Sequence, residues 1–191
     1  AMVTEYVARN LAETSTPYVV PVHFLDRPTS GVILFARTSK AAERLAAQFR
    51  TRAIEKTYHA LVEGAPPLSG ECVDYLVKDH GRNVVSLGRA EQAEAKRSRL
   101  RFRHIDSYER LSLLEIQPES GRSHQIRVQL SSRGFPIFGD TKYGASCTWA
   151  GAIALHAARI QFTHPLTKEL LTISAPWPKS WLEVWHGQAP H

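Results

Sequence analysis

Between positions 97 and 103 every second residue is an arginine. The arginines are Arg97, Arg99, Arg101 and Arg103, and the residues between them are Ser98, Leu100 and Phe102. A period of two residues is that of a β-strand, whose successive side chains point to opposite faces. The arginines would therefore share one face, while Leu100 and Phe102 point into a core. This alternation predicts a strand over residues 96–105 and a sheet that buries one of its faces.

Four like charges along one strand repel each other, so this arginine row needs acidic neighbours or a polyanion. One explanation is protection of an exposed sheet edge, with Glu91, Glu94 or acids on an adjacent strand neutralising the charge. The other explanation is a series of phosphate contacts beside a functional cleft. We favour the second explanation.

The other regular elements follow from apolar periodicity and from capping residues. Further strands are expected at residues 18–22, 32–36, 56–64, 111–117, 153–162 and 170–174. Helices are expected from Thr38 or Ser39 to about residue 52, from the N-cap Ser123 to about residue 132, and shortly after Pro178. The first helix carries an apolar stripe made of Ala42, Leu45, Ala46 and Phe49.

Two regions give no clear pattern. Residues 71–95 show only short strand fragments, and residues 1–17 show no period, so we interpret residues 1–17 as a loosely ordered extension. No linker divides residues 18–191, which we interpret as a single domain. Because strands outnumber helices and the hairpins are local, we predict an α+β fold with a mostly antiparallel mixed sheet flanked by helices.

Composition narrows the class of protein. A chain of 191 residues with 43% hydrophobic content suits one medium domain, and no apolar run is long enough to span a membrane. Cys72 and Cys147 lie far apart without zinc-site spacing, which indicates reduced thiols in a cytoplasmic protein, although a disulfide between them stays open. A net charge of +6 and a pI of about 9.5 favour a nucleic acid as partner.

The stretch His23–Gly31 places a carboxylate, Asp26, between two apolar runs. Pro28 fixes the backbone of its own position and restricts the residue before it, and Gly31 permits a tight turn. A rigidly held carboxylate suits catalysis, but Asp26 could equally cap the turn with its side chain. From this stretch alone we favour the capping role.

Five motifs together resemble one family. HFLDRPTSG (23–31) is similar to the His-Arg-Leu-Asp-x-x-Thr-Ser-Gly signature of the RluA-type pseudouridine synthases, and KTYHALVEG (56–64) to their Lys-x-Tyr-x-Ala-x-Val-x-Gly strand. GRSHQIRVQL (121–130) resembles their Gly-Arg-Thr-His-Gln-Ile-Arg-x-His-Leu helix. GFPIFGDTKYG (134–144) and the closing segments 155–169 and 173–176 follow in the family's order.

The resemblance implies a pseudouridine synthase fold around a central RNA-binding cleft. It implies isomerisation of uridine to pseudouridine in structured RNA, either rRNA or tRNA, by a monomer that uses neither cofactor nor metal. Asp26 matches the family's catalytic aspartate, which acts as a nucleophile or stabilises a cationic sugar. Arg127 matches the arginine that pairs with it, and Tyr58 the tyrosine that stacks on the target base. Taken alone, Arg127 could be a solvated helix residue and Tyr58 simple packing.

The same resemblance gives the expected substrate contacts. Ile126 and Leu130 would form walls of the uracil pocket, and Lys56 would support the site or contact phosphate. His124 and Gln125 are expected to organise the start of their helix. The arginine row of Arg97, Arg99, Arg101 and Arg103 would follow the RNA backbone.

Several positions depart from the family. Phe24 replaces an arginine that helps to displace the target base, Gln129 replaces a histidine, and Pro28 stands where an acidic or other residue is usual. Phe24 would either pack into the core or wedge into the RNA stack. The family's upstream Asn-Lys-Pro-Ala-Gly segment is not found, which leaves a shortened, truncated or divergent member. These departures keep open a catalytically silent RNA-binding protein, whereas a glycoside hydrolase lacks its second carboxylate.

Overall fold

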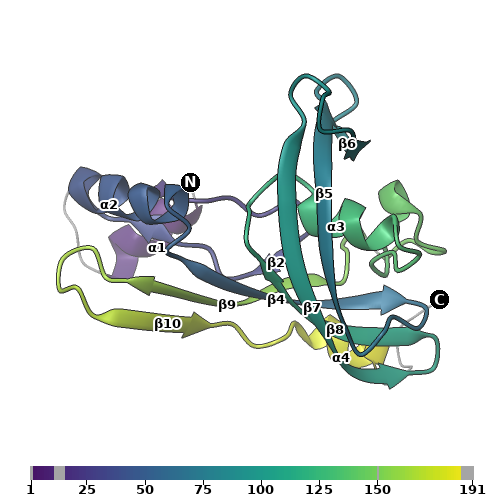
Figure 1. The fold of residues 1–191 in the computed structure, drawn as a ribbon. Coiled ribbons are helices and arrows are strands. Elements are labelled where there is room, and N and C mark those ends of the chain that lie inside the picture. The colour runs from purple at the N-terminus through teal and green to yellow at the C-terminus, as the bar shows by residue number, and fades with distance from the viewer. Residues whose placement is uncertain (1, 11–15, 150, 186–191) are drawn as a thin grey trace.

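The computed structural model describes residues 2–10, 16–149 and 151–185, and its main feature is one eight-stranded mixed sheet (Figure 1). The strand order is β10-β9-β4-β8-β7-β5-β6, with β2 paired in parallel to β9 and the other neighbours antiparallel. The strands are β2 (Ser30–Gly31), β4 (Glu55–Glu63), β5 (Ser69–Asp79), β6 (Val84–Gly88), β7 (Lys96–Tyr108), β8 (Leu111–Pro118), β9 (Leu155–Thr163) and β10 (Leu170–Ser174). The predicted α+β fold with a mostly antiparallel sheet is confirmed.

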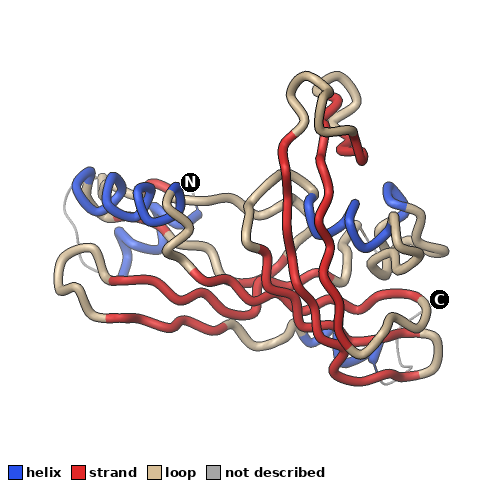
Figure 2. Tube along the Cα trace, in the orientation of Figure 1, coloured by secondary structure: helices blue, strands red, loops and turns tan. Residues whose placement is uncertain are grey.

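The sheet has two arms that meet at β4 and β8. β5 and β7 rise together and carry β6 at their upper end, whereas β9 and β10 extend sideways below α1 and α2 (Figure 1). Figure 2 shows the strands as a continuous band through both arms. The remaining elements are α1 (Met2–Asn10), α2 (Ser39–Arg50), α3 (Gln125–Ser131), a 3-10 turn η1 (Thr141–Tyr143), α4 (Lys179–Trp185) and a small sheet of β1 (Val20–Pro21) with β3 (Phe35–Ala36).

The helix predicted after residue 38 is confirmed as α2. The Thr38 side chain accepts a hydrogen bond from the Ala41 N–H at 3.1 Å, which satisfies a donor of the first turn. Ala41 and Leu45 are buried and pack against β9 residues such as Ile160. Ala46 is exposed, so its place in the predicted apolar stripe was wrong. Ala41, four residues before Leu45, is buried instead, because the buried face is centred on these two residues.

The helix predicted near residue 124 is also present, but its cap differs. His124 is the N-cap, with a left-handed φ of 50° and no side-chain cap hydrogen bond, so the prediction of Ser123 as cap was wrong. Every residue of α3 from Gln125 to Leu130 is buried. A helix enclosed on all sides transmits its position directly to the groups that it carries.

The two regions without a clear pattern form regular structure. β5 is one strand of 11 residues that begins at Ser69, just before the first of these regions, and ends at Asp79. Residues 2–10 form α1, which corrects the expectation of a loose extension; residues 1 and 11–15 lie outside the described residues. Met2 and Tyr6, and Val3 and Val7, are each four residues apart, as on one face of a helix. That short pattern was missed, and no residue of α1 is buried in the structure.

The main core lies where β4, β7 and β8 pack against α3 and α4. Leu61, Leu114, Ile116 and Leu130 are fully buried there, and Trp181 closes the core from α4 with 1% of its surface exposed. In the described part of the chain, no helix is long and apolar enough to cross a membrane.

Candidate active site

The loop that carries Asp26 is fixed at both ends. The Thr29 N–H donates to the Asp26 carbonyl at 2.8 Å, which closes a turn. Ser30 and Gly31 then form β2, which pairs with His156 and Ala157 of β9. Gly31 has a φ of 115°, and a Cβ there would lie 2.3 Å from the Ala157 carbonyl oxygen. Only glycine tolerates that approach and that dihedral angle, so Gly31 holds the Asp26 loop against the sheet.

Tyr58 reaches the same place from β4. The register between β4 and β9 shifts between Thr57 and Tyr58, because Thr57 pairs with Arg159 and Tyr58 with Ala157. Such a bulge changes the direction of the side chains beside it. Ala157 is also the partner of Gly31, so the bulge and the Asp26 loop meet at one residue of β9.

Arg127 approaches from α3 and joins the two carboxylates of the site. Its Nη1 lies 3.5 Å from Asp26 Oδ2. Its Nε and Nη2 donate to the two carboxylate oxygens of Asp140, each at 2.7 Å, in a bidentate pair. Arg127 is 5% exposed and Asp140 1% exposed. The predicted pairing of Asp26 with Arg127 is confirmed. The Asp26 side chain therefore contacts a guanidinium, which its own stretch of sequence did not indicate.

No role was predicted for Asp140 or Tyr143, although both lie in the 134–144 motif. The Arg127 guanidinium carbon lies 4.9 Å from the centre of the Tyr143 ring, within cation–π range. The Tyr143 hydroxyl is 2.7 Å from His124 Nδ1 and accepts from the Val85 N–H at 2.9 Å. Burial lowers the pKa of Arg127. The hydrogen bonds and charge of Asp140 and the charge of Asp26 raise it by more than burial lowers it, so the pKa of Arg127 is raised above its ordinary value.

Asp26 and Tyr58 border a cleft of about 420 Å³, and Arg127 contacts Asp26 from outside the lining of this cleft. Asp26, Tyr58, Ile126 and Leu155 line its inner part, and Phe24 stands at its rim with 80% of its surface exposed. Phe24 therefore does not pack into the core. Leu130 is fully buried in the core and is absent from the lining, so its prediction as a pocket wall was wrong. Ile126, in the first turn of α3, lines the cleft, whereas Leu130, one turn later, packs only in the core.

The inner cleft shifts the protonation of three groups. Burial, and next the charge of Asp26, raise the pKa of Tyr58 to about 12, so its phenol is neutral at physiological pH. Burial, and next the charge of Lys56, lower the pKa of His23 to about 4. Neutral His23 accepts a hydrogen bond from the Leu34 N–H at 3.0 Å and stabilises the Asp26 loop. Burial also lowers the pKa of Lys56.

Gln125 and His124 organise the helix start, as expected. Gln125 accepts a hydrogen bond from the Ser120 hydroxyl at 2.8 Å and donates to the Arg99 carbonyl at 3.0 Å. The loop before α3 is thereby tied to β7. His124 contacts Tyr143 through its Nδ1.

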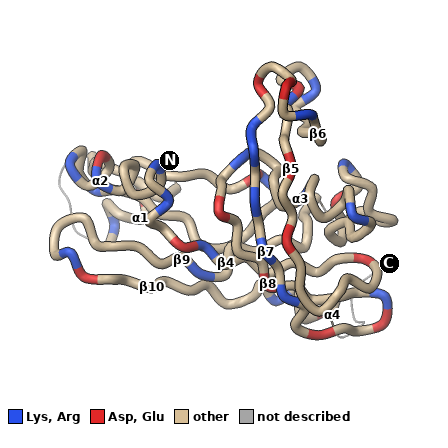
Figure 3. The backbone as a smooth tube through the Cα atoms, viewed as in Figure 1, with Lys and Arg blue, Asp and Glu red and all other residues tan. Residues whose placement is uncertain are grey.

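Ser98, Leu100 and Phe102 are buried on one face of β7, and the arginines that alternate with them lie on the other face, as predicted. Figure 3 shows the basic residues along the backbone of β7. β7 is hydrogen-bonded to β8 and β5, so the row protects no sheet edge. Glu71 and Glu119 contact Arg99 at 2.6 and 3.1 Å. The remaining close pairs are Arg101 with Glu119 at 3.1 Å and Arg103 with Glu115 at 3.3 Å. Acids on adjacent strands thus neutralise much of the row, and such exposed pairs stabilise little.

A family comparison agrees with this geometry. The model of the RNA pseudouridylate synthase family matches residues 2–132, which is more than half of the chain and includes Asp26, Tyr58 and Arg127. The chain belongs to this family. It is an isomerase that converts uridine to pseudouridine in RNA.

Relatives of known function are similar over almost the whole chain. tRNA pseudouridine synthase C of Yersinia pestis is 33% identical over 212 aligned positions, covering 98% of this chain and 82% of the relative. The Vibrio cholerae protein of the same name is 32% identical, with 96% and 81% covered. The solved human RNA pseudouridylate synthase domain containing 4 has the same fold, with a TM-score of 0.78 at 23% identity over 98% of this chain and 80% of that one.

Proposed function

We propose that this enzyme modifies tRNA and that Asp26, Tyr58 and Arg127 carry the reaction. The observation that carries the residue roles is the 3.5 Å approach of Arg127 to Asp26 in the cleft that Tyr58 lines. The tRNA substrate is supported by relatives named tRNA pseudouridine synthase C, which share about a third of their residues with this chain. The free thiols Cys72 and Cys147 fit the reducing cytoplasm.

The isomerisation breaks the bond between the ribose and N1 of uracil and forms a bond between the ribose and C5. Ionised Asp26 is placed to attack the sugar or to stabilise its positive charge as the base departs. Arg127 orients that carboxylate from the buried side. The C5 proton must then leave, while N1 gains a proton, so the overall composition is unchanged.

The neutral phenol of Tyr58 suits stacking and hydrogen bonding to the detached base. With a pKa of about 12, Tyr58 is protonated at physiological pH and is a poor source of phenolate there. Ile126 and Leu155 supply apolar walls on which a uracil ring can pack. Phe24, exposed at the rim, is positioned to stack into the gap that an extruded uridine leaves in the RNA.

The catalytic assignment is tested with Asp26→Asn. We expect no pseudouridine in tRNA transcripts treated with this variant, because an amide cannot act as an anionic nucleophile. Wild-type protein should modify the same transcripts, as read by pseudouridine-specific chemical labelling and sequencing. Asp79→Asn is the matched control, since it removes a half-exposed carboxylate at the far end of β5.

Two results would contradict the proposal. Turnover by Asp26→Asn at the wild-type rate would remove Asp26 from the chemistry. Wild-type protein that binds these transcripts tightly but forms no pseudouridine in them would favour the catalytically silent RNA-binding alternative, or a substrate other than tRNA. An assay on rRNA transcripts would separate these two explanations, because pseudouridine formed in rRNA but not in tRNA would indicate an active enzyme with another substrate.

A further inference from the structure

A second depression adjoins the catalytic cleft. It has a volume of about 730 Å³, larger than the cleft itself, and we call it the basic groove. Its lining comes from the end of α2, the start of β4, the end of β8 with the following loop, and β9. The groove and the cleft share six lining residues, namely Phe49, Lys56, Pro118, Ser120, Gly121 and Arg122. The two depressions are therefore neighbours with a common wall.

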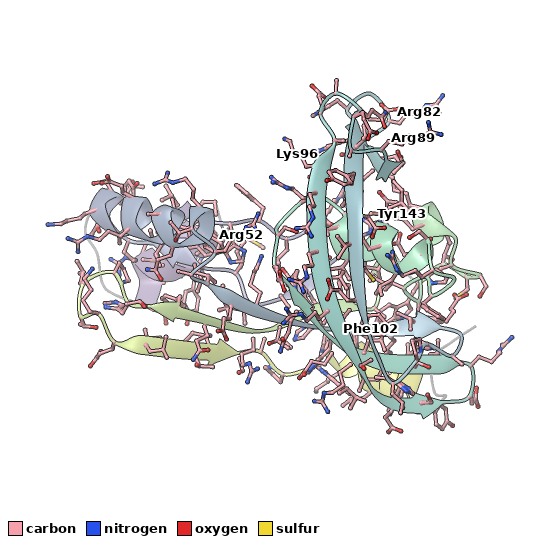
Figure 4. All side chains as sticks on the ribbon, in the orientation of Figure 1. Arg52, Arg82, Arg89, Lys96, Phe102 and Tyr143 are labelled. Carbon is pink, nitrogen blue, oxygen red and sulfur yellow. The ribbon has the colours of Figure 1, made fainter. Side chains whose placement is uncertain are left out.

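The groove has an excess of positive charge. Its described lining includes six cationic side chains and two carboxylates: Arg50, Arg52, Lys56, Arg101, Arg122 and Arg159 against Glu55 and Glu119. In the described part of the chain, Arg101 alone of these six forms a salt bridge, to Glu119 and more distantly to Glu71. Arg52 projects into the space between α2 and β7 (Figure 4). Five cations around one concave surface, without a carboxylate partner in contact, indicate a site for an anion.

Lys56 lies where the two depressions join. Its Nζ is 3.4 Å from the position that a Cβ on Gly121 would occupy, so a side chain at residue 121 would crowd the amine. Lys56 is partly buried and belongs to the lining of both depressions. A partly buried ammonium without an anionic partner is unfavourable in free protein and is satisfied when an anion arrives.

We propose that the basic groove binds the RNA strand next to the target uridine, with Lys56 on the phosphate that joins this uridine to its neighbour. This inference rests on the proposed function, because it takes the uridine to lie in the Asp26 cleft. The cleft would then hold the reacting nucleotide, and the groove would hold the backbone that follows it. Arg52, on the segment after α2, and Arg159, on β9, both line this path.

The test compares two double variants of equal charge change. Arg52→Gln with Arg159→Gln removes two groove cations. Arg82→Gln with Arg89→Gln removes two exposed cations at the tip of the upright arm, far from Arg52 (Figure 4). Binding of a fluorescently labelled tRNA transcript to each protein is measured over a range of salt concentrations, and folding of each variant is checked by thermal unfolding.

The groove pair should weaken binding roughly tenfold and lower the slope of log affinity against log salt by about 1.4 to 1.8, since each lost phosphate contact removes about 0.7 to 0.9. The tip pair should leave both quantities unchanged. Lys56→Met should lower the slope by about 0.7 to 0.9. The groove variant should lose rate at low RNA concentration and regain it at saturating RNA.

Equal losses from the groove pair and the tip pair would overturn the proposal, because affinity would then depend on net charge alone. An unchanged slope in the groove pair or in Lys56→Met would also overturn it. These readings do not depend on catalysis: wild-type protein that binds the transcript but forms no pseudouridine defeats the proposed function and leaves the groove measurement intact. Wild-type protein that fails to bind the transcript would count against both.

Discussion

At the scale of single residues, Arg127 is bound by two carboxylates with different surroundings. Asp140 takes Nε and Nη2 in a buried bidentate pair, which fixes the plane of the guanidinium. Nη1 remains for Asp26, at the longer distance of 3.5 Å. Asp140 therefore positions Arg127, and through it the Asp26 carboxylate, which we propose to act on the substrate.

We expect Asp140→Asn to lower kcat at least tenfold, because a misplaced catalytic group costs up to about a hundredfold in rate. Breaking a buried pair also destabilises the protein by about 3 to 5 kcal/mol, so thermal unfolding must confirm that the variant is folded at the assay temperature. RNA affinity should change less than twofold. Asp74→Asn is the matched control, because Asp74 pairs with Arg133 just after the end of α3 at 3.0 Å, and neither residue lines the cleft. Equal kcat losses in both variants would show that Asp140 acts through stability alone.

Asp26, Tyr58 and Arg127 could be found from the sequence because each lies in a short local motif. Asp140 also lies in a quoted motif, but its role depends on how residues 134–144 fold back onto α3, which no local pattern records. Leu130 was misplaced for a related reason. A spacing of four residues places Ile126 and Leu130 on one face of a helix, but it does not say where along that face the cleft ends.

At the scale of elements, the two-residue strand β2 connects the catalytic loop to the sheet. We expect Gly31→Ala to lower kcat at least tenfold, because the new Cβ would lie 2.3 Å from the Ala157 carbonyl oxygen and would push the Asp26 loop away from β9. Gly134→Ala is the control. Gly134 also has a positive φ, 83°, but a Cβ there meets nothing within 4 Å.

Both glycine variants should lose about 1 to 3 kcal/mol of stability from backbone strain. Denaturant unfolding measures that shared loss, and steady-state kinetics measures the difference between the variants. If Gly31→Ala and Gly134→Ala retain the same kcat, the close approach of β2 to β9 does not position Asp26.

The strands show which features a local sequence pattern can predict and which depend on the arrangement of the sheet. The alternation of β7 correctly placed its arginines on one face, but Glu71 and Glu119, which neutralise Arg99, come from parts of the chain 28 and 20 residues away. Only the order of strands in the sheet brings them together. β5 was hidden because only Cys72 and Leu76 are buried on one face, while Val73 and Val77 place apolar side chains on the other face, so apolar and polar residues do not alternate.

At the scale of the whole molecule, four histidines link stability to pH: His124 and His156 are buried, and His23 and His59 are partly buried. Burial is the main cause that lowers the pKa of each, to about 4 for His23 and in the same direction for His59, His124 and His156. A histidine with a lowered pKa in the folded state binds protons more readily when unfolded, so it favours folding at high pH. The free energy of unfolding should therefore fall as pH decreases from 6.5 toward 4.

Denaturant unfolding at several pH values measures this fall, and His23→Gln should reduce its size. Glutamine offers an oxygen that can accept the Leu34 N–H but does not titrate. A free energy of unfolding that is constant from pH 6.5 to pH 4 would contradict the assignment of these histidines as neutral in the folded protein.

β4 is hydrogen-bonded to β9 on one side and to β8 on the other, so Tyr58 and the loop of Asp26 belong to one continuous sheet. Arg127, the third proposed catalytic residue, lies on the buried helix α3, so one sheet and one enclosed helix hold all three side chains. The conformational change needed for the reaction then falls on the RNA, whose uridine must leave its stack at a cost of a few kcal/mol. That cost is smallest where the uridine is unpaired, so the local mechanics of the nucleic acid would help to select the target even without any contact that reads a base.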